Sequence, residues 1–482
     1  MSGKWSFDGG TPVRPGFYID YRNTATTSVA GGAFGTVAMP VTADWGPIDE
    51  VVSITSEGSL VNTFGPDDGT GATTSYLVRE ALIGGAKEVK VVRIADGTEA
   101  KASKVLGNVT PTGTALTLTA KYHGLRGDDF TVTVRENPLD NTKNDLIIYE
   151  NGIEREIYTH TKASVTALGA TINAESNLVD ATVAVGGVAL ATVTASAFTG
   201  GDSGTSTVAA DYLNAQDILE REGGWDIYVM DGISDSSIKT AAIAWIEDLN
   251  NVGQYSMIVV GGPDSETVPA GISLAEGYDS EYVVSFGGGD IKMTLADGTE
   301  VTRNTAEGAP RIAGVIAAAG ITGSATRAQL PGIAAVTPLT KAEAEAAIAG
   351  GMLTLTKRQG VTIIEDGITT FTTFTDEKDE TFATISNIRA MQQIGFDLDY
   401  IFENEWLGKV RNTTTAQNAL VTRAKDYFKK LEAQNVLITG TEVELDTRFD
   451  NTGYAVYLLV NAQFGLELKK ILITLRAPQI AA

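Results

Sequence analysis

The hydrophobic periodicity of the chain changes twice, and these changes limit the folds that it can adopt. From residue 34 to about residue 95, apolar strands alternate with short amphipathic helices. Between about residues 100 and 200, apolar residues and threonines alternate with a period of two, as in short, half-buried strands. From about residue 205 strands and helices alternate again. The sequence therefore predicts an α/β and α+β multidomain protein with an inserted β-rich domain, a barrel or a sandwich.

Glycine pairs and capping residues mark the ends of the predicted helices. A helix from Thr74 to Ile83 is followed by Gly84-Gly85, and a helix from Val208 to Glu222 is followed by Gly223-Gly224. Glycine at these positions is a common C-terminal signal. Asp235 is an expected N-cap for a helix with apolar residues at 3,4 spacing. Helices alternating with buried strands predict a mostly parallel sheet covered by helices.

The last part of the chain combines long helices with short strands. One helix carries an apolar side from Phe382 to Ile394, and a second spans Thr413 to Glu432. Strand patterns follow at Thr441–Asp446, Tyr454–Ala462 and Leu466–Arg476. This mixture predicts an α+β domain at the C-terminal end.

Both ends of the chain carry an isolated strand pattern. The alternating apolar residues are Phe17, Ile19 and Tyr21 near the N-terminus and Ile471, Ile473 and Leu475 near the C-terminus. The first strand lies between prolines and a polar stretch, far from its next partner in the sequence. Its pattern fits an extended arm and an ordinary edge strand equally well.

Charge and residue usage exclude several classes of function. The net charge of −24 argues against binding to nucleic acid, since affinity for phosphate comes mainly from Lys and Arg. The chain has no cysteine, which excludes disulfides, zinc–thiolate sites and cysteine nucleophiles. No apolar run is long enough to predict a membrane span. The start of the chain has no signal-peptide pattern.

Residue types that carry chemistry do not form a motif in this sequence. His123 and His160 have no second ligand at metal spacing. The loops at 261–264 and 287–290 are rich in glycine, but neither matches a phosphate-binding pattern. Acidic pairs such as Glu365-Asp366 are expected by chance among 60 acidic residues. We therefore predict no catalytic, cofactor-binding or metal-binding residues.

Several local patterns, in order, resemble the contractile-tail sheath proteins of phages and phage-derived particles. Each pattern is short, and their order covers nearly the whole chain. They include Arg14–Tyr18 (RPGFY), Trp45–Pro47 (WGP), Val91–Arg93 after Gly84-Gly85, Gly124–Val132 (GLRGDDFTV) and Gly367–Thr370 (GITT). Asp128 and Thr369 stand where asparagine is usual in that family.

The resemblance implies a non-enzymatic subunit with a defined domain order. The expected parts are an arm at 1–27, a sheath core at 28–98 and 351–462, an inserted β-rich outer domain at 99–203, a middle α/β domain at 204–350 and a second arm at 463–482. In such proteins the C-terminal domain is built from both chain ends. The terminal arms reach neighbouring subunits and complete shared sheets. An exchange of this kind is heterologous and propagates into rings or helices.

The resemblance also implies the partners and the location. We expect the chain to bind copies of itself in hexameric rings, a tail tube protein, and baseplate and terminator proteins, with no nucleic acid, direct membrane contact or cofactor. The location would be the tail of a virion or tail-like particle, assembled in the host bacterial cytoplasm. Candidates for tube contact are the basic residues Arg423, Lys425, Lys429 and Lys430 of the helix at 413–432. A solvated helix face explains these residues equally well.

Two other functions remain open on the sequence. The first is another structural assembly protein, such as a tube or surface-layer subunit. A tube subunit is usually shorter and dominated by one barrel. The second is an α/β hydrolase that uses the acidic loops near Asp264 or Asp290. That activity requires perturbed carboxylates that converge in one pocket.

Overall fold

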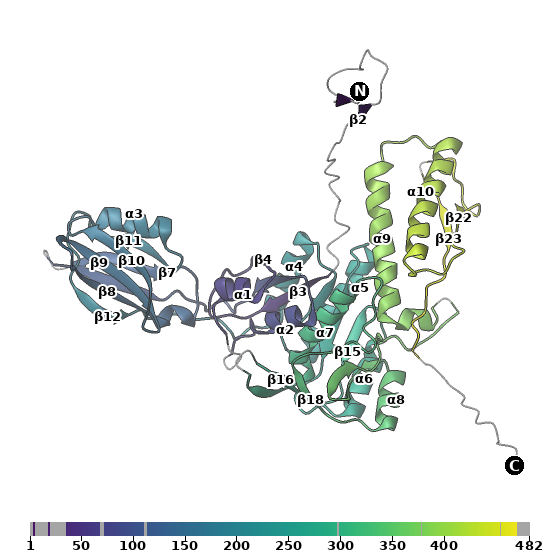
Figure 1. Cartoon of the computed structure of the whole chain (residues 1–482), viewed down its shortest axis with the longest axis horizontal. Helices are drawn as coiled ribbons and strands as arrows, with labels where there is room; N and C mark the ends of the chain where they lie inside the picture. The colour runs from purple at the N-terminus through teal and green to yellow at the C-terminus, as the bar shows by residue number, and fades with distance from the viewer. Residues whose placement is uncertain are drawn as a thin grey trace.

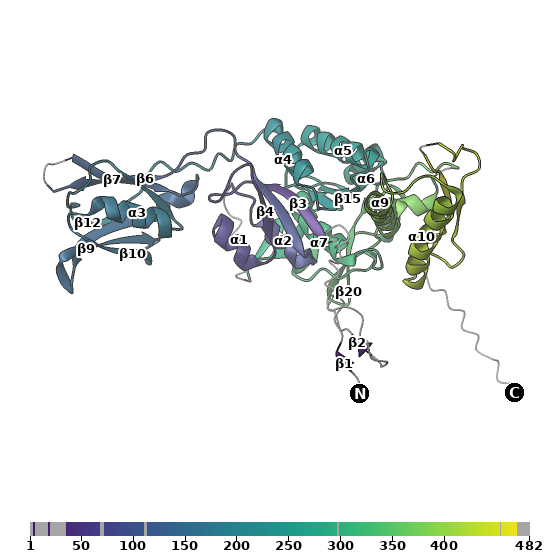
Figure 2. The same ribbon diagram turned by 90° about the horizontal axis from the view of Figure 1, so that it is seen from above.

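The computed structural model describes residues 35–67, 72–109, 113–295, 298–376, 378–453 and 455–469, and the backbone of two short strands, β1 (Gly3–Lys4) and β2 (Tyr18–Ile19). The main body has three parts in a row, seen in both views (Figures 1 and 2). A β-rich domain lies at one end, an α/β core in the middle, and a helix pair with a small sheet at the other end. Among the described residues, no helix has the length and apolar character needed to cross a membrane.

The core is a seven-stranded sheet in the order β19-β15-β14-β13-β3-β5-β4. Neighbouring strands are parallel, except that β4 runs antiparallel to β5 at one edge. The predicted, mostly parallel sheet is therefore confirmed. Its strands are β3 (Thr36–Val41), β4 (Val51–Ile54), β5 (Glu88–Arg93), β13 (Ile227–Val229), β14 (Met257–Gly261), β15 (Val283–Phe286) and β19 (Met352–Leu353).

This sheet joins two segments that the sequence assigns to different domains. Strand β3 pairs with β13 in parallel, with Val37 opposite Ile227. The described parts of 28–98 and 204–350 therefore contribute strands to one sheet. The inserted domain separates these strands in the chain, and periodicity carries no information about such distant pairing.

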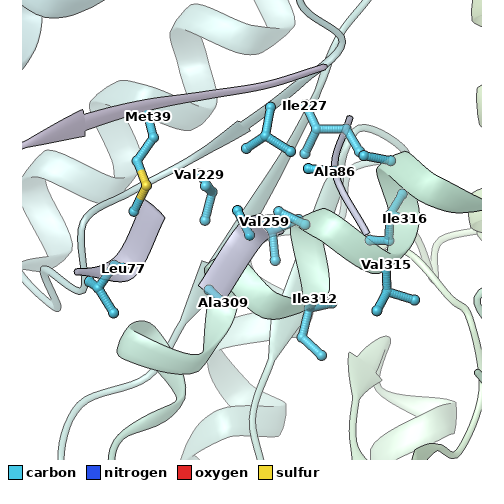
Figure 3. Close-up of a cluster of buried hydrophobic side chains, with 14 of the residues drawn as sticks. Met39, Leu77, Ala86, Ile227, Val229, Val259, Ala309, Ile312, Val315 and Ile316 are labelled. Carbon is cyan, nitrogen blue, oxygen red and sulfur yellow. The ribbon is translucent and has the colours of Figure 1, made fainter. Parts of the chain in front are cut away.

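Helices cover both faces of the sheet, as the amphipathic patterns require. On one face, apolar side chains of α2 and α7 pack against the strands. The buried strand residues there include Met39, Val229 and Val259 (Figure 3). On the other face, α4 and α5 pack on Ala38 and Tyr228. The helices of the core are α1 (Glu57–Phe64), α2 (Leu77–Gly84), α4 (Ala209–Glu222), α5 (Ser236–Asn251), α6 (Val268–Tyr278), α7 (Thr305–Ala319) and α8 (Lys341–Ala349).

Local signals predicted several helix ends correctly. The backbone N–H groups of Ser237 and Ile238 donate to the Asp235 side chain, so Asp235 caps α5 as expected. Gly85 ends α2 in the left-handed region, at φ 111°. Helix α2 begins at Leu77, three residues later than predicted.

The inserted domain is a β-sandwich with one helix. Its sheets have the orders β10-β9-β8-β12 and β11-β7-β6. The elements are β6 (Ser103–Asn108), β7 (Gly113–Ala120), the 3₁₀ helix η2 (Leu125–Asp129), β8 (Phe130–Asn137), β9 (Asp140–Glu150), β10 (Ile153–Thr161), α3 (Val165–Glu175), β11 (Val179–Val183) and β12 (Val193–Ala197). Trp45, from the core segment after β3, lies in the sandwich's own hydrophobic cluster.

Small sheets and two long helices complete the described structure. The small strands beside the core are β16 (Ile291–Thr294), β17 (Glu300–Arg303), β18 (Ile333–Val336), β20 (Leu355–Arg358) and β21 (Val361–Ile364). The C-terminal part contains the 3₁₀ helix η3 (Glu380–Ala383), α9 (Ile385–Glu405), α10 (Thr414–Ala433), β22 (Glu442–Leu445) and β23 (Leu458–Asn461). The sequence predicted both long helices, although α9 continues past Ile394.

Candidate intersubunit surfaces

The C-terminal part has its own hydrophobic cluster, which holds α10 against α9 and the small sheet. Ala424, Phe428 and Leu431 of α10 are buried in it. The Tyr427 hydroxyl donates a hydrogen bond of 2.8 Å to Asp397 of α9. Burial, together with this carboxylate, raises the pKa of Tyr427, so its hydroxyl stays protonated and keeps donating. These contacts hold α9 and α10 together, and the surfaces described below are built on this helix pair.

The sheet of this part contains only two strands within the described residues. Strand β22 pairs with β23 in antiparallel register, with Val443 opposite Val460. Val443 packs towards α10, whereas Glu442 and Glu444 are exposed. A two-stranded sheet presents backbone donors and acceptors along its outer edges, where further strands can add. This pair is therefore a candidate acceptor for a strand from elsewhere.

An apolar groove of ≈ 780 Å³ lies beside this sheet, at the ends of α9 and α10. Its lining includes Phe402, Trp406, Leu407, Val410, Leu420 and Leu458. Leu407 and Val410 are 66% and 45% exposed. Exposed leucine and valine in a groove are typical of a contact surface. The sequence reading missed these residues, although the run Trp406-Leu407 after a helix was a usable signal.

The predicted basic residues of α10 are all present on the helix, but they differ in environment. Lys425, Lys429 and Lys430 are exposed. Arg423 is half-buried and donates two hydrogen bonds, of 2.9 and 2.8 Å, to Glu405 of α9. That hydrogen-bonded pair holds the pKa of Glu405 below its usual value. The three lysines are therefore the accessible positive charges of this group.

Most of the predicted arm residues lie outside the described residues. Phe17, Tyr21, Ile471, Ile473 and Leu475 belong to this set. The backbone of Ile19 is part of β2, which pairs in parallel with β1. The expected C-terminal strand is described only at its start, residues 466–469. These four residues are not in a strand.

The two glycine-rich loops that resembled phosphate sites surround a carboxylate of the chain itself. A Cβ on Gly262 would lie 2.1 Å from Glu266 Oε1, and a Cβ on Gly287 would lie 3.0 Å from Oε2. Burial raises the pKa of Glu266, and the charge of the buried Lys239 opposes that rise. The glycines therefore make room for an internal acid.

The acidic residues of the alternative hydrolase hypothesis serve as local acceptors. Asp264 accepts a hydrogen bond from Asn304, and Asp290 accepts one from the backbone of Ser265. Glu365 is paired with Arg327 and Arg358. Among the described residues, no group of three or more histidine or acidic side chains is placed to hold a metal ion.

The fold and these surfaces define a multidomain structural subunit with a β-sandwich inserted into an α/β core. Four regions of the chain match domains of tail sheath proteins. Residues 35–94 match the tail sheath protein Gp18 domain III N-terminal region, 95–203 the phage tail sheath protein beta-sandwich domain, 206–370 the phage tail sheath protein central domain and 377–477 the phage tail sheath C-terminal domain. The chain belongs to the phage tail sheath protein family, a family of structural proteins and not of enzymes.

Individual relatives agree with this assignment. Phage-like element PBSX protein XkdK of Bacillus subtilis is 28% identical, with 83% of this chain and 81% of the relative covered. The sheath tail protein of Desulfitobacterium hafniense has the same fold, with a TM-score of 0.72, 22% identity, and 93% and 100% of the two chains covered. The contracted sheath of an extracellular contractile injection system, PVC, gives a TM-score of 0.56 at 11% identity, with 97% and 98% covered.

Proposed function

We propose that this chain polymerises helically, as stacked rings around a tail tube, and contracts to drive the tube through a target cell envelope. The observation that carries the proposal is the β22–β23 pair beside the apolar groove, to which no further strand of the described residues adds. Both ends of the chain have strand patterns of their own. A strand from a neighbouring subunit would hydrogen-bond to the backbone groups along the edge of this pair. It would also bury apolar side chains of the groove. The patch that donates the strand differs from the patch that accepts it. The contact is therefore repeated from subunit to subunit and builds rings or helices.

Contraction then follows as rigid-body rotation of subunits that stay connected by their arms. The extended state is a kinetically trapped state, and the contracted state forms more contacts between sheath domains. No nucleotide is needed, because the free energy is stored during assembly. The partners are further copies in rings, which we expect to be hexameric, the tube protein, and baseplate and terminator proteins.

In this proposal the tube contact is polar and weak enough to be released. The exposed lysines of α10 suit it, because they offer positive charge on a chain whose net charge is −24. The location is the tail of a virion or tail-like particle. Assembly takes place in the bacterial cytoplasm.

Negative-stain electron microscopy of the full chain, beside a variant that lacks residues 1–27, tests the proposal. We expect striated tubes or ring stacks from the full chain and their loss from the shortened one. A far-UV circular dichroism spectrum shows whether the shortened chain is folded. Monodisperse globular particles in both samples, at high concentration and with tube protein supplied, would overturn the proposal.

A further inference from the structure

The point where the core begins is held by a buried carboxylate. Asp226, just before β13, accepts hydrogen bonds from the backbone N–H groups of Gly35 (3.3 Å) and Thr36 (2.9 Å). The same carboxylate pairs with Arg389 of α9 at 2.6 Å. The Arg389 side chain is 1% exposed. One acid therefore joins the N-terminal root of the core, which we define as Gly35–Thr36, to α9.

The last described segment carries a second carboxylate, Glu467, which also contacts α9. Glu467 accepts hydrogen bonds of 2.7 Å from Ser386 of α9 and 2.7 Å from Thr326. Two residues later, Lys469 pairs with Asp366 at 2.6 Å. We define Glu467–Lys469 as the C-terminal root.

In the C-terminal segment the charged side chains face the subunit and the leucines face outwards, which is the reverse of the usual arrangement. Glu467 and Lys469 contact the body of the subunit, whereas Leu466 and Leu468 are 71% and 82% exposed. In an ordinary surface segment the leucines would face the body and the charged residues would face water. Polar contacts therefore hold this segment in place.

Both roots are linked to the N-terminal end of α9, at Ser386 and Arg389. Ser386 and Arg389 are three residues apart, so they lie on the same side of the helix. This turn is itself fixed in the main core, because Ile385 and Ile388 are each 2% exposed and belong to its hydrophobic cluster. A pull on the C-terminal root is thus transmitted to the α/β core through this turn, whereas the N-terminal root enters the core directly through β3 and is joined to α9 by the Asp226–Arg389 pair.

We propose that the N-terminal end of α9, from Ile385 to Arg389, is a common anchor of both terminal arms, with Asp226 and Glu467 as its positioning residues. The two anchors differ in strength. The N-terminal one is a buried ion pair with backbone donors, whereas the C-terminal one uses two hydroxyls and a partly exposed ion pair. When subunits rotate, we expect the weaker C-terminal root, Glu467–Lys469, to yield before the N-terminal one. This inference rests on the proposed exchange of arms between subunits.

Spin labels test the C-terminal anchor directly, because the chain has no native cysteine. Leu468→Cys and Lys341→Cys place labels at two exposed sites, one beside the anchor and one on α8 of the core. We expect a narrow distance distribution for dilute, unassembled protein by double electron–electron resonance. Glu467→Ala should broaden it at least twofold, whereas the exposed Glu403→Ala should leave it unchanged. An equally narrow distribution in Glu467→Ala would overturn the anchor.

A charge exchange separates anchoring from a general loss of stability. Lys469→Asp places a carboxylate against Asp366 and should loosen the segment, whereas Asp366→Lys combined with Lys469→Asp should restore the narrow distribution. Failure of the double variant to restore it would show that the ion pair does not anchor the segment. The threshold concentration for tube formation should follow the same order, rising several-fold in Glu467→Ala and Lys469→Asp. An unchanged threshold despite broadened distances would refute the role in assembly.

The N-terminal anchor is tested by Asp226→Asn. This change should speed hydrogen exchange at the Gly35 and Thr36 amides more than tenfold, with the near-UV circular dichroism retained. Unchanged exchange would overturn this half of the proposal. If the full chain forms no tubes at all, the proposed function fails, but the distance and exchange measurements still decide whether the anchors exist.

Discussion

At the scale of single residues, Asp231 is a buried acid that accepts hydrogen bonds from two neutral hydroxyls. It accepts hydrogen bonds from Tyr212 (2.9 Å) and Thr74 (3.0 Å), at the end of β13. Burial raises its pKa to about 6, and the two donors oppose that rise. Because the folded pKa lies above the unfolded value of about 3.9, the stabilising contribution is complete below the unfolded value and is lost as the pH rises through about 6.

We expect Asp231→Asn to remove this pH dependence. Between pH of about 4 and about 8, the free energy of unfolding of the wild type should fall by about 3 kcal/mol relative to that of the variant, two pKa units at about 1.4 kcal/mol each. Urea denaturation across this pH range measures the difference. Parallel curves for the two proteins would contradict the raised pKa.

At the scale of elements, α2 and α7 cross at two glycines. A Cβ on Gly314 of α7 would lie 2.1 Å from the carbonyl oxygen of Ala81, and a Cβ on Gly84 of α2 would lie 2.4 Å from that of Arg311. The helix backbones are therefore in direct contact. Near this crossing, the buried Arg311 donates a hydrogen bond of 3.0 Å to Glu80 of α2, which fixes the same two helices.

Gly314→Ala should force the two helices apart and lower the free energy of unfolding by about 1–3 kcal/mol or more, as overpacking of a core does. A matched control is Gly277→Ala in α6, where a Cβ meets nothing within 4 Å. That substitution should be neutral or stabilise by up to about 1 kcal/mol, since alanine favours helix. Equal effects of the two substitutions, by chemical denaturation, would contradict the close crossing.

The exposed lysines of α10 lead to a prediction about binding to the tube protein. Reversing the charge of Lys425, Lys429 and Lys430 to Glu should weaken co-assembly of sheath with tube at least tenfold and reduce its salt dependence. Assembly of the sheath alone should persist, because these lysines are exposed and lie outside the groove. Co-sedimentation with tube protein at several salt concentrations provides the measurement. The control reverses the exposed or half-exposed lysines Lys143, Lys162 and Lys341.

At the scale of the whole molecule, the sandwich is joined to the core by specific contacts. Trp45, from the core segment, packs edge-on against Tyr122 and Phe130 of the sandwich, with ring centroids 5.3 and 5.5 Å apart. Arg126 lies over the Trp45 ring, 5.1 Å from its centroid. The buried Arg93 of β5 donates to the carbonyls of Gly46 and His123, on the two sides of the junction. We therefore expect the sandwich to move together with the core.

Trp45→Ala should uncouple the two domains. Removing a buried tryptophan costs about 3–5 kcal/mol, and this loss falls on the sandwich because Trp45 belongs to its hydrophobic cluster. Differential scanning calorimetry should show a new transition at lower temperature, with the core transition retained. Trp45→Phe, which keeps part of the apolar contact, should shift the transition less. A single transition displaced as a whole would contradict the assignment of Trp45 to the sandwich.

Much of the fold followed from local patterns in the sequence. The period of the apolar residues identified the inserted β-rich region and the two long C-terminal helices. Asp235 and Gly85 gave correct helix ends, because capping depends on the few residues around a terminus. The ordered motifs indicated the family, and the lysines of α10 were visible in the sequence as a cluster of positive charge.

Only the tertiary structure decided which distant segments meet. The pairing of β3 with β13, the closure of the glycine loops around Glu266 and the convergence of Asp226 and Glu467 on α9 join residues far apart in the chain. Periodicity records which side of an element is buried, but many partners can bury it. The choice among them is made by packing, hydrogen-bond geometry and charge pairing across the whole fold, which no short stretch of sequence contains.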